Sequence, residues 1–88
     1  HLYMFSGKSS WITMKVEKWG INDVIDWLGR DIDIIEKEDH YFVRVKANET
    51  SIGYWAIQFG GSVEILEPAS LRNWVKEQVT KIYEKYKD

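Results

Sequence analysis

The sequence predicts an α+β domain of the ferredoxin-like class, a βαββαβ sandwich with one additional helix at its C-terminal end. Three observations support this prediction. Four short stretches either alternate apolar and polar residues or form brief apolar runs, which is typical of strands. Three longer stretches repeat apolar residues with helical spacing. Glycine or proline residues lie where these stretches end or begin, as expected at element boundaries.

The first part of the chain predicts a strand, a helix and a second strand. Residues 10–17 alternate apolar and polar side chains, the pattern of a half-buried strand. Asn22 is expected to cap a helix over residues 21–28 by accepting a hydrogen bond from a free backbone N–H. Gly29 is expected to close this helix, because glycine adopts the left-handed conformation readily, and to lead into a strand over residues 32–35.

A polar cluster at residues 37–40 lies between two strand-like runs, so we expect a hairpin loop there, followed by a strand over residues 41–47. Two right-handed strand–helix–strand crossovers then place the strands of residues 10–17 and 41–47 at the centre of the sheet. Both crossover helices lie on one face of the sheet in this arrangement.

The second crossover has the clearest boundaries. A helix from Asn48 to Phe59 carries an apolar face, and Gly60 is expected to end it in the same way as Gly29 ends the first helix. A strand over residues 63–66 follows. The last helix is expected to start at Pro68, which suits a first helical turn, and to run to about residue 86.

Composition limits the classes of protein to consider. The 88 residues have room for one core, and 12 basic against 14 acidic residues give a net charge of −2, which provides no general attraction for nucleic acid or membranes. The chain has no cysteine and no apolar run of membrane-spanning length. We therefore expect a soluble, cytoplasmic domain. Because the chain starts with His1, we interpret it as a fragment of a larger protein.

No residue pattern predicts catalysis. His40 lies in the expected hairpin loop, where a solvated histidine is common. The acidic residues around Asp31 and Asp33 lack the spacing of a calcium loop. We expect no catalytic, cofactor-binding or metal site, and we expect that the domain is not an enzyme.

The predicted sheet leaves one face without a helix. Trp11, Phe42 and Arg44 fall on this face, and an aromatic patch of this kind is typical of a contact surface. We expect the last helix to cover part of it and a partner to cover the rest. The candidate interface residues are Trp11, Trp27, Phe42, Arg44, Trp74 and Tyr83.

Several segments resemble one known family. The run YWAIQFG at residues 54–60, the run VEILEP at 63–68 and Leu71-Arg72 resemble the carboxy-terminal extension, or WCX, domain of bacterial WYL-domain, helix-turn-helix transcriptional regulators. The segments HLYMFSG at residues 1–7 and INDVIDWLG at 21–29 are similar to other parts of that extension.

This resemblance implies a linker remnant at residues 1–9 and an extension domain at residues 10–88. It implies a regulatory and dimerisation module that acts through protein contacts, with a homodimer, the upstream WYL and helix-turn-helix domains of the same chain and, through the absent N-terminal domain, DNA as partners. No cofactor and no membrane contact is implied. Ligand and DNA residues of the WYL module have no counterpart in this sequence.

Two other functions stay open from the sequence. The βαββαβ order is shared with RNA-recognition domains, and residues 41–45 with Trp11 faintly resemble their stacking aromatics, so the sheet is an alternative single-stranded nucleic-acid-binding surface. A small-molecule sensor that holds an effector between paired ferredoxin-like units is the other alternative, although no residue specifies an effector.

Overall fold

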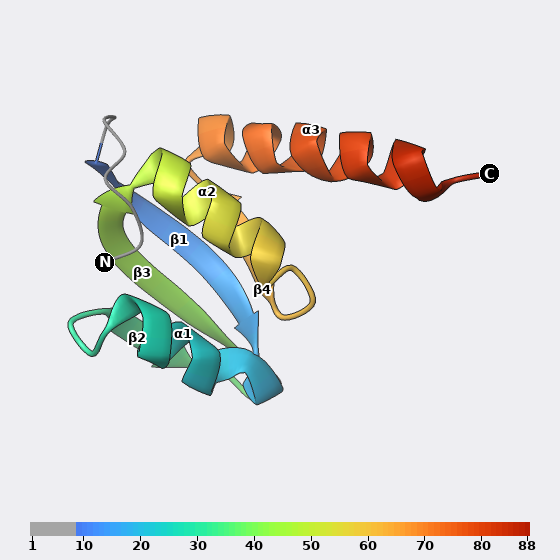
Figure 1. Cartoon of the computed structure of the whole chain (residues 1–88). Coiled ribbons are helices and arrows are strands. Elements are labelled where there is room, and N and C mark those ends of the chain that lie inside the picture. Colours follow the sequence, from blue (N-terminus) through green and yellow to red (C-terminus); the bar gives the residue numbers. More distant parts are fainter. Residues whose placement is uncertain (1–8) are drawn as a thin grey trace.

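A four-stranded antiparallel sheet forms one layer of the domain, and helices cover one of its two faces (Figure 1). The computed structural model describes residues 9–88. In chain order the elements are β1 (Ser9–Glu17), a short 3₁₀ helix η1 (Lys18–Gly20), α1 (Ile21–Leu28), β2 (Asp33–Glu36), β3 (His40–Asn48), α2 (Glu49–Gln58), β4 (Val63–Glu67) and α3 (Ala69–Tyr86). The predicted ferredoxin-like α+β class with a C-terminal helix is confirmed.

The strand order is β2-β3-β1-β4, so β1 and β3 occupy the centre as predicted. Ile12 lies opposite Val45 and Met14 lies opposite Val43 in the pairing of these two strands. The pairing of β1 with β4 shifts between Thr13 and Met14, which marks a β-bulge near the end of β4.

The hydrophobic core lies between the sheet and the helices α1 and α2, which cover the same face (Figure 1). Its residues come from alternate positions of the strands and from the inward stripes of the helices. They are Ile12, Met14, Val16, Val24, Val43, Val45, Ile52, Trp55, Ala56, Val63, Ile65 and Leu71. This side of each strand is the side that the period-two pattern assigns to the core.

Helix α3 begins on the domain and then leaves it. Near its start Leu71 is buried, and the first half of the helix packs against α2 and β4. The second half extends beyond the rest of the domain to the C-terminus (Figure 1). Its large side chains Ile82, Tyr83 and Tyr86 are exposed.

The predicted cap of the first helix is wrong. The 3₁₀ turn at Lys18–Gly20 runs directly into α1, and the backbone N–H of Ile21 donates to the Lys18 carbonyl oxygen. The N-cap residue is therefore Gly20, which has no side chain to accept a hydrogen bond, and Asn22 lies inside the first turn. The continuous turn removes the free helix start that Asn22 was expected to cap.

The two glycine stops are not equivalent, contrary to the prediction. Gly29 closes α1 with φ of 87°, and its N–H donates to the Ile25 carbonyl oxygen at 2.9 Å. After α2, the Phe59 carbonyl oxygen accepts from the N–H groups of Ser62 and Val63, each at 3.0 Å. Because these bonds close the turn, Gly60 does not need a left-handed conformation, and among residues 9–88 only Gly29 has a positive φ.

The expected boundaries differ slightly from the observed ones at both ends of the domain. Ser9, expected in the linker, already belongs to β1, and the rest of the expected linker, residues 1–8, lies outside the described residues. Pro68 is the N-cap of α3, one residue before the helix, instead of its first residue. Within residues 9–88, no helix has the length and hydropathy needed to cross a membrane.

Candidate protein-contact surfaces

The sheet face opposite the core carries the main group of predicted contact residues. Trp11 on β1 is 50% exposed, and the Arg44 guanidinium on β3 lies 4.3 Å from the centroid of its ring. This is a cation–π contact between β1 and β3, the two central strands. Phe42 on the same face is half-buried, and the His40 ring meets it edge-on at 4.9 Å. Helix α3 does not bury Trp11 or Arg44, so the expectation that it covers part of this face fails at these two residues.

On the open sheet face, basic side chains lie on the central strands and acidic side chains lie on the edge strands. Lys15 and Arg44 lie on the two central strands. Asp33 on β2 lies opposite Arg44, and Glu64 on β4 lies opposite Lys15. Since directly opposed residues share a face, the basic centre of the sheet is flanked by acidic side chains at both edges.

The other predicted contact residues lie elsewhere. Trp27 on α1 is 47% exposed and packs against Phe59 at the end of α2, with ring centroids 6.0 Å apart. Trp74 is half-buried between α3 and α2, where it meets Tyr54 edge-on at 5.1 Å. Tyr83 is exposed on the projecting half of α3. The structure therefore brings Trp11, Phe42 and Arg44 together and places the remaining three at separate positions.

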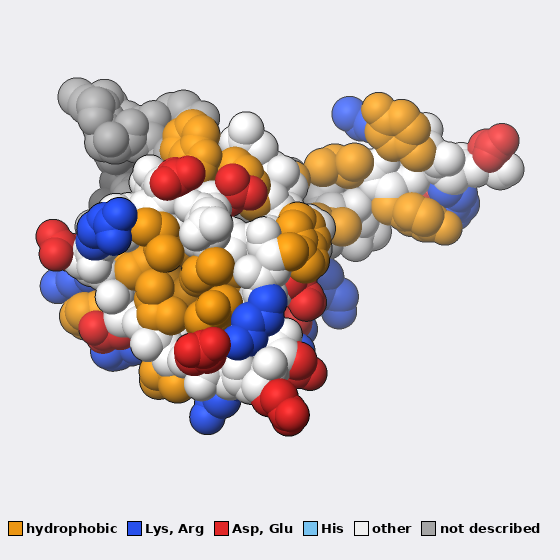
Figure 2. All heavy atoms as spheres, turned by 90° about the horizontal axis from the view of Figure 1, so that it is seen from below, with side chains coloured by type: hydrophobic (Ala, Val, Ile, Leu, Met, Phe, Trp, Pro, Cys, Tyr) orange, Lys and Arg blue, Asp and Glu red, His pale blue; other side chains and the backbone are white. Residues whose placement is uncertain are grey.

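Further exposed hydrophobic side chains are present on the edge strand β2 and along α3. Figure 2 views the domain from the side of α1 and β2 and shows hydrophobic side chains gathered there, with more along the projecting α3. On β2, Ile35 lies opposite Phe42 and therefore belongs to the open sheet face, whereas Ile34 lies opposite Val43 on the core side, and both are exposed. This edge also carries Asp33 and Glu36, and charged residues on a short edge strand discourage the addition of another strand.

The hairpin between β2 and β3 contains the only described histidine. Asp39 Oδ1 lies 2.6 Å from His40 Nδ1, and this hydrogen bond holds the pKa of the Asp39 carboxyl below its usual value. Nearby, the Lys18 ammonium donates to Glu36 at 2.7 Å, which raises the pKa of Lys18. Both pairs are at the surface, where such contacts stabilise little. Across residues 9–88, no three histidine, aspartate or glutamate side chains are grouped as a metal site requires.

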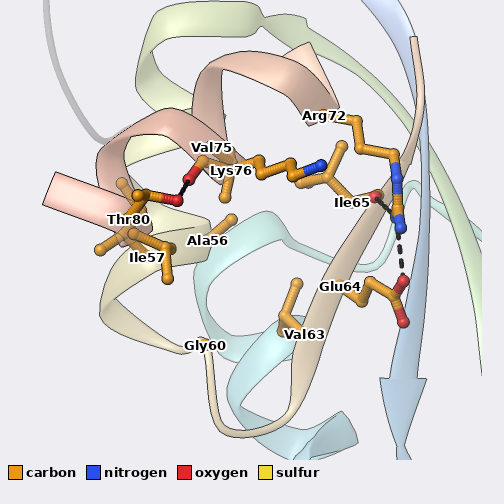
Figure 3. A pocket seen from close by; sticks show the side chains of 11 residues that line it. Ala56, Ile57, Gly60, Val63, Glu64, Ile65, Arg72, Val75, Lys76 and Thr80 are labelled. Carbon is orange, nitrogen blue, oxygen red and sulfur yellow. Dashed lines mark hydrogen bonds and ion pairs between the residues drawn. The ribbon is translucent and has the colours of Figure 1, made fainter. Parts of the chain in front are cut away.

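A groove that sequence reasoning missed lies between α2, β4 and α3 (Figure 3). Its volume is about 460 Å³. Three elements supply its lining, which consists of Ala56, Ile57, Gly60, Val63, Glu64, Ile65, Arg72, Val75, Lys76, Val79 and Thr80. The floor is apolar, and Lys76 and Arg72 supply cations along the α3 side. Sequence reasoning could not locate this groove, because its walls form only where α3 packs beside α2 and β4.

Arg72 lies at the wall of this groove and contacts the edge strand. Its Nη1 donates to Glu64 Oε2 at 2.9 Å and to the Ile65 carbonyl oxygen at 2.7 Å (Figure 3). The Arg72 side chain therefore links α3 to β4, and it hydrogen-bonds a backbone carbonyl oxygen of this edge strand. This pairing fixes the start of α3 relative to the sheet edge.

Comparison with known proteins identifies the domain. A search of curated proteins gives no match. The family model of the WCX domain matches residues 8–83, which includes all the strands, the first two helices and most of α3. The chain therefore belongs to the WCX domain family.

Proposed function

We propose that this WCX domain is a regulatory module of a WYL-type bacterial transcriptional regulator, which acts through protein contacts and pairs two copies of the regulator. The family match over residues 8–83 is the observation that carries this proposal. The exposed Trp11–Arg44 pair supports the protein-contact part, because tryptophan and arginine are enriched in interface centres.

The open sheet face is proposed to receive upstream domains of the same chain. The polypeptide enters the sheet at Ser9, two residues before Trp11. A domain joined directly to this strand has a high effective concentration at the adjacent face, so even a modest complementary surface would bind there. The basic side chains of Lys15 and Arg44 favour an acidic rim on that surface.

Pairing of two copies fits the proposed biological role. DNA-reading domains of the helix-turn-helix class commonly act as dimers on two related half-sites. A C-terminal module that joins two copies would fix the spacing of the N-terminal DNA readers. Contacts between this module and the upstream domains would then transmit a signal to DNA binding.

Oxidative footprinting tests the proposed sheet contact. In the full-length regulator, we expect Trp11 to be oxidised several times more slowly than in the 88-residue chain, because the upstream domains cover it. Trp19 is the matched control, since it is 72% exposed and lies outside the open face, in η1. Equal Trp11 oxidation in the two proteins would contradict the contact.

Sedimentation tests the proposed pairing. We expect the full-length regulator to be a dimer and a version that lacks residues 9–88 to be largely monomeric, with weaker operator binding. If removal of these residues leaves the dimer intact, the domain does not pair the two copies.

The alternative of a nucleic-acid-binding sheet has one favourable observation. Lys15 and Arg44 lie beside Trp11 and Phe42, a combination that could hold stacked bases. The acidic Asp33 and Glu64 at the sheet edges oppose it, because they repel phosphate groups. Salt-dependent binding of labelled single-stranded RNA or DNA that is lost on Phe42→Ala would favour this alternative.

A further inference from the structure

The projecting half of α3 has an apolar face that is exposed. Val79, Ile82, Tyr83 and Tyr86 fall at i, i+3, i+4 and i+7, so they share one side of the helix. All four are exposed, from 43% for Ile82 to 83% for Tyr86. Such an apolar face does not stabilise a helix end that is surrounded by water. We name residues 79–86 the α3 tail.

The groove beside α3 has the opposite property, because it is an apolar surface without an occupant in the described chain. Ala56 and Ile57 come from α2, Val63 comes from β4, and Val75 comes from α3. Val79 belongs to both the groove and the tail, so the two apolar surfaces are continuous along α3. The apolar groove and the exposed apolar face of the α3 tail are therefore adjacent.

The edge of β4 indicates how the groove is filled. An extended peptide that added to this edge would need its backbone acceptors, but the Ile65 carbonyl oxygen already accepts from Arg72 at 2.7 Å. Strand addition at this point would have to break that charge-assisted bond. The groove therefore suits an occupant that contributes side chains, as an amphipathic helix does.

The α3 tail fits the groove in length and in chemistry. The eight residues of the tail span about 12 Å, and the part of α3 that lines the groove, Arg72 to Thr80, spans about 13 Å. Two tyrosine rings of the tail match the groove cations Arg72 and Lys76, because ammonium and guanidinium groups are attracted to aromatic faces. The fold already uses this pairing between Lys18 and Tyr41, at 4.6 Å.

We infer that the α3 tail of one copy packs into the groove of a second copy, and that the second tail fills the first groove in return. The two α3 helices then run antiparallel, with the two-fold axis close to Val79. Such an interface is isologous and closed, so it produces dimers instead of fibres. This inference rests on the proposed pairing of two copies and assigns that pairing to α3 and the groove.

Two variants of the 88-residue chain test the two halves of the contact. Ile82→Asp places a charge on the exposed tail, and Ile57→Arg fills the groove. Each variant should raise the dimer dissociation constant by at least about tenfold, because a buried unpaired charge is costly. Glu77→Lys, on the far side of α3 and outside the groove, should leave dimerisation unchanged and is the matched control.

A mixing experiment distinguishes tail-in-groove packing from simple contact between two helices. The Ile82→Asp chain keeps an intact groove, and the Ile57→Arg chain keeps an intact tail. A mixture of the two should form heterodimers with one intact contact, more stable than either variant's homodimer. Sedimentation of a labelled mixture measures this. If Ile57→Arg unfolds the domain, Lys76→Glu at the exposed groove wall replaces it.

The outcomes separate this inference from the proposed function. A dimer that Ile82→Asp disrupts while both groove variants leave it unchanged would overturn the groove contact. A dimer that resists all α3 and groove variants but is lost on Trp11→Ser would place pairing on the sheet face and overturn the inference alone. A wild-type chain and full-length regulator that both stay monomeric at high concentration would contradict pairing itself.

Discussion

At the scale of single residues, Gly53 sets how closely α3 approaches α2. It is buried in the middle of α2, where glycine is about 1 kcal/mol less favourable than alanine. A Cβ atom at this position would lie 2.7 Å from Cζ3 of Trp74 and 3.2 Å from Cδ1 of Leu71. The absence of a side chain therefore creates the space in which the Trp74 ring lies.

We predict that Gly53→Ala lowers the free energy of unfolding by about 1–2 kcal/mol, because overpacking outweighs the gain in helix propensity. Chemical denaturation measures this, and a shift in tryptophan fluorescence would report the displaced Trp74 ring. Gly61→Ala is the control, since its added Cβ would make an ordinary contact of 3.6 Å with Trp19. A variant as stable as the wild type would show that Trp74 moves freely and does not fix α3.

The positions of some candidate contact residues could be predicted from the sequence, whereas the contacts of others could not. Trp11 and Arg44 were predicted to share a face, and they do, because strand alternation determines the face of a residue without knowledge of its neighbours. Trp27 lies off the inward stripe of α1, and the sequence offered no partner for it. Its contact with Phe59 depends on how closely the end of α2 approaches α1, which the predicted placement of both helices on one face does not specify.

At the scale of elements, a side-chain cap stabilises the start of α2. The sequence predicts a helix start at Asn48, and the structure places the N-cap there. Asn48 is the N-cap, and its Oδ1 accepts a hydrogen bond from the Ser51 N–H at 2.9 Å. This bond satisfies one of the backbone donors that every helix start leaves free. The helix carries Ile52 and Trp55 into the core, so its position affects the whole domain.

We predict that Asn48→Ala lowers the free energy of unfolding by about 1 kcal/mol, because the Ser51 N–H loses its acceptor. Asn48→Asp should retain most of the stability, since aspartate caps equally well and favours the positive end of the helix dipole. Thermal and urea unfolding of the two variants measure the difference. Equal losses in both would mean that Asn48 acts through contacts other than the cap.

The elements themselves were largely predictable, whereas their boundaries depended on contacts between neighbouring segments. Alternation in residues 10–17 and helical spacing in residues 48–59 are local signals that the core later satisfies. The predicted cap at Asn22 was wrong because the η1 turn continues into α1, and no local sequence pattern predicts that turn. Gly60 resembled Gly29 in sequence, but the hydrogen bonds of Ser62 and Val63 closed its turn differently.

At the scale of the whole molecule, the direction of α3 could not be predicted from sequence. Its spacing predicts a helix of the right length, but that spacing is compatible with packing across the open sheet face or along α2. The contacts of Arg72 with Glu64 and Ile65 at the sheet edge, and the space at Gly53, place the helix beside α2. The open face and the groove both result from that placement.

This placement divides the chain into a folded body and an exposed tail at the C-terminal end of α3. Leu71, Trp74 and Val75 pack on the body, whereas the side chains after Thr80 are all exposed. A chain that ends at Thr80 should therefore unfold cooperatively, with a free energy of unfolding within about 0.5 kcal/mol of the wild-type monomer, because it loses only exposed residues.

The same truncation should abolish dimerisation, since it removes Ile82, Tyr83 and Tyr86. Denaturation at low protein concentration measures the first expectation, and sedimentation at high concentration measures the second. A truncated chain that loses cooperative unfolding would show that the tail supports its own domain, and a truncated chain that still dimerises would show that pairing uses another surface.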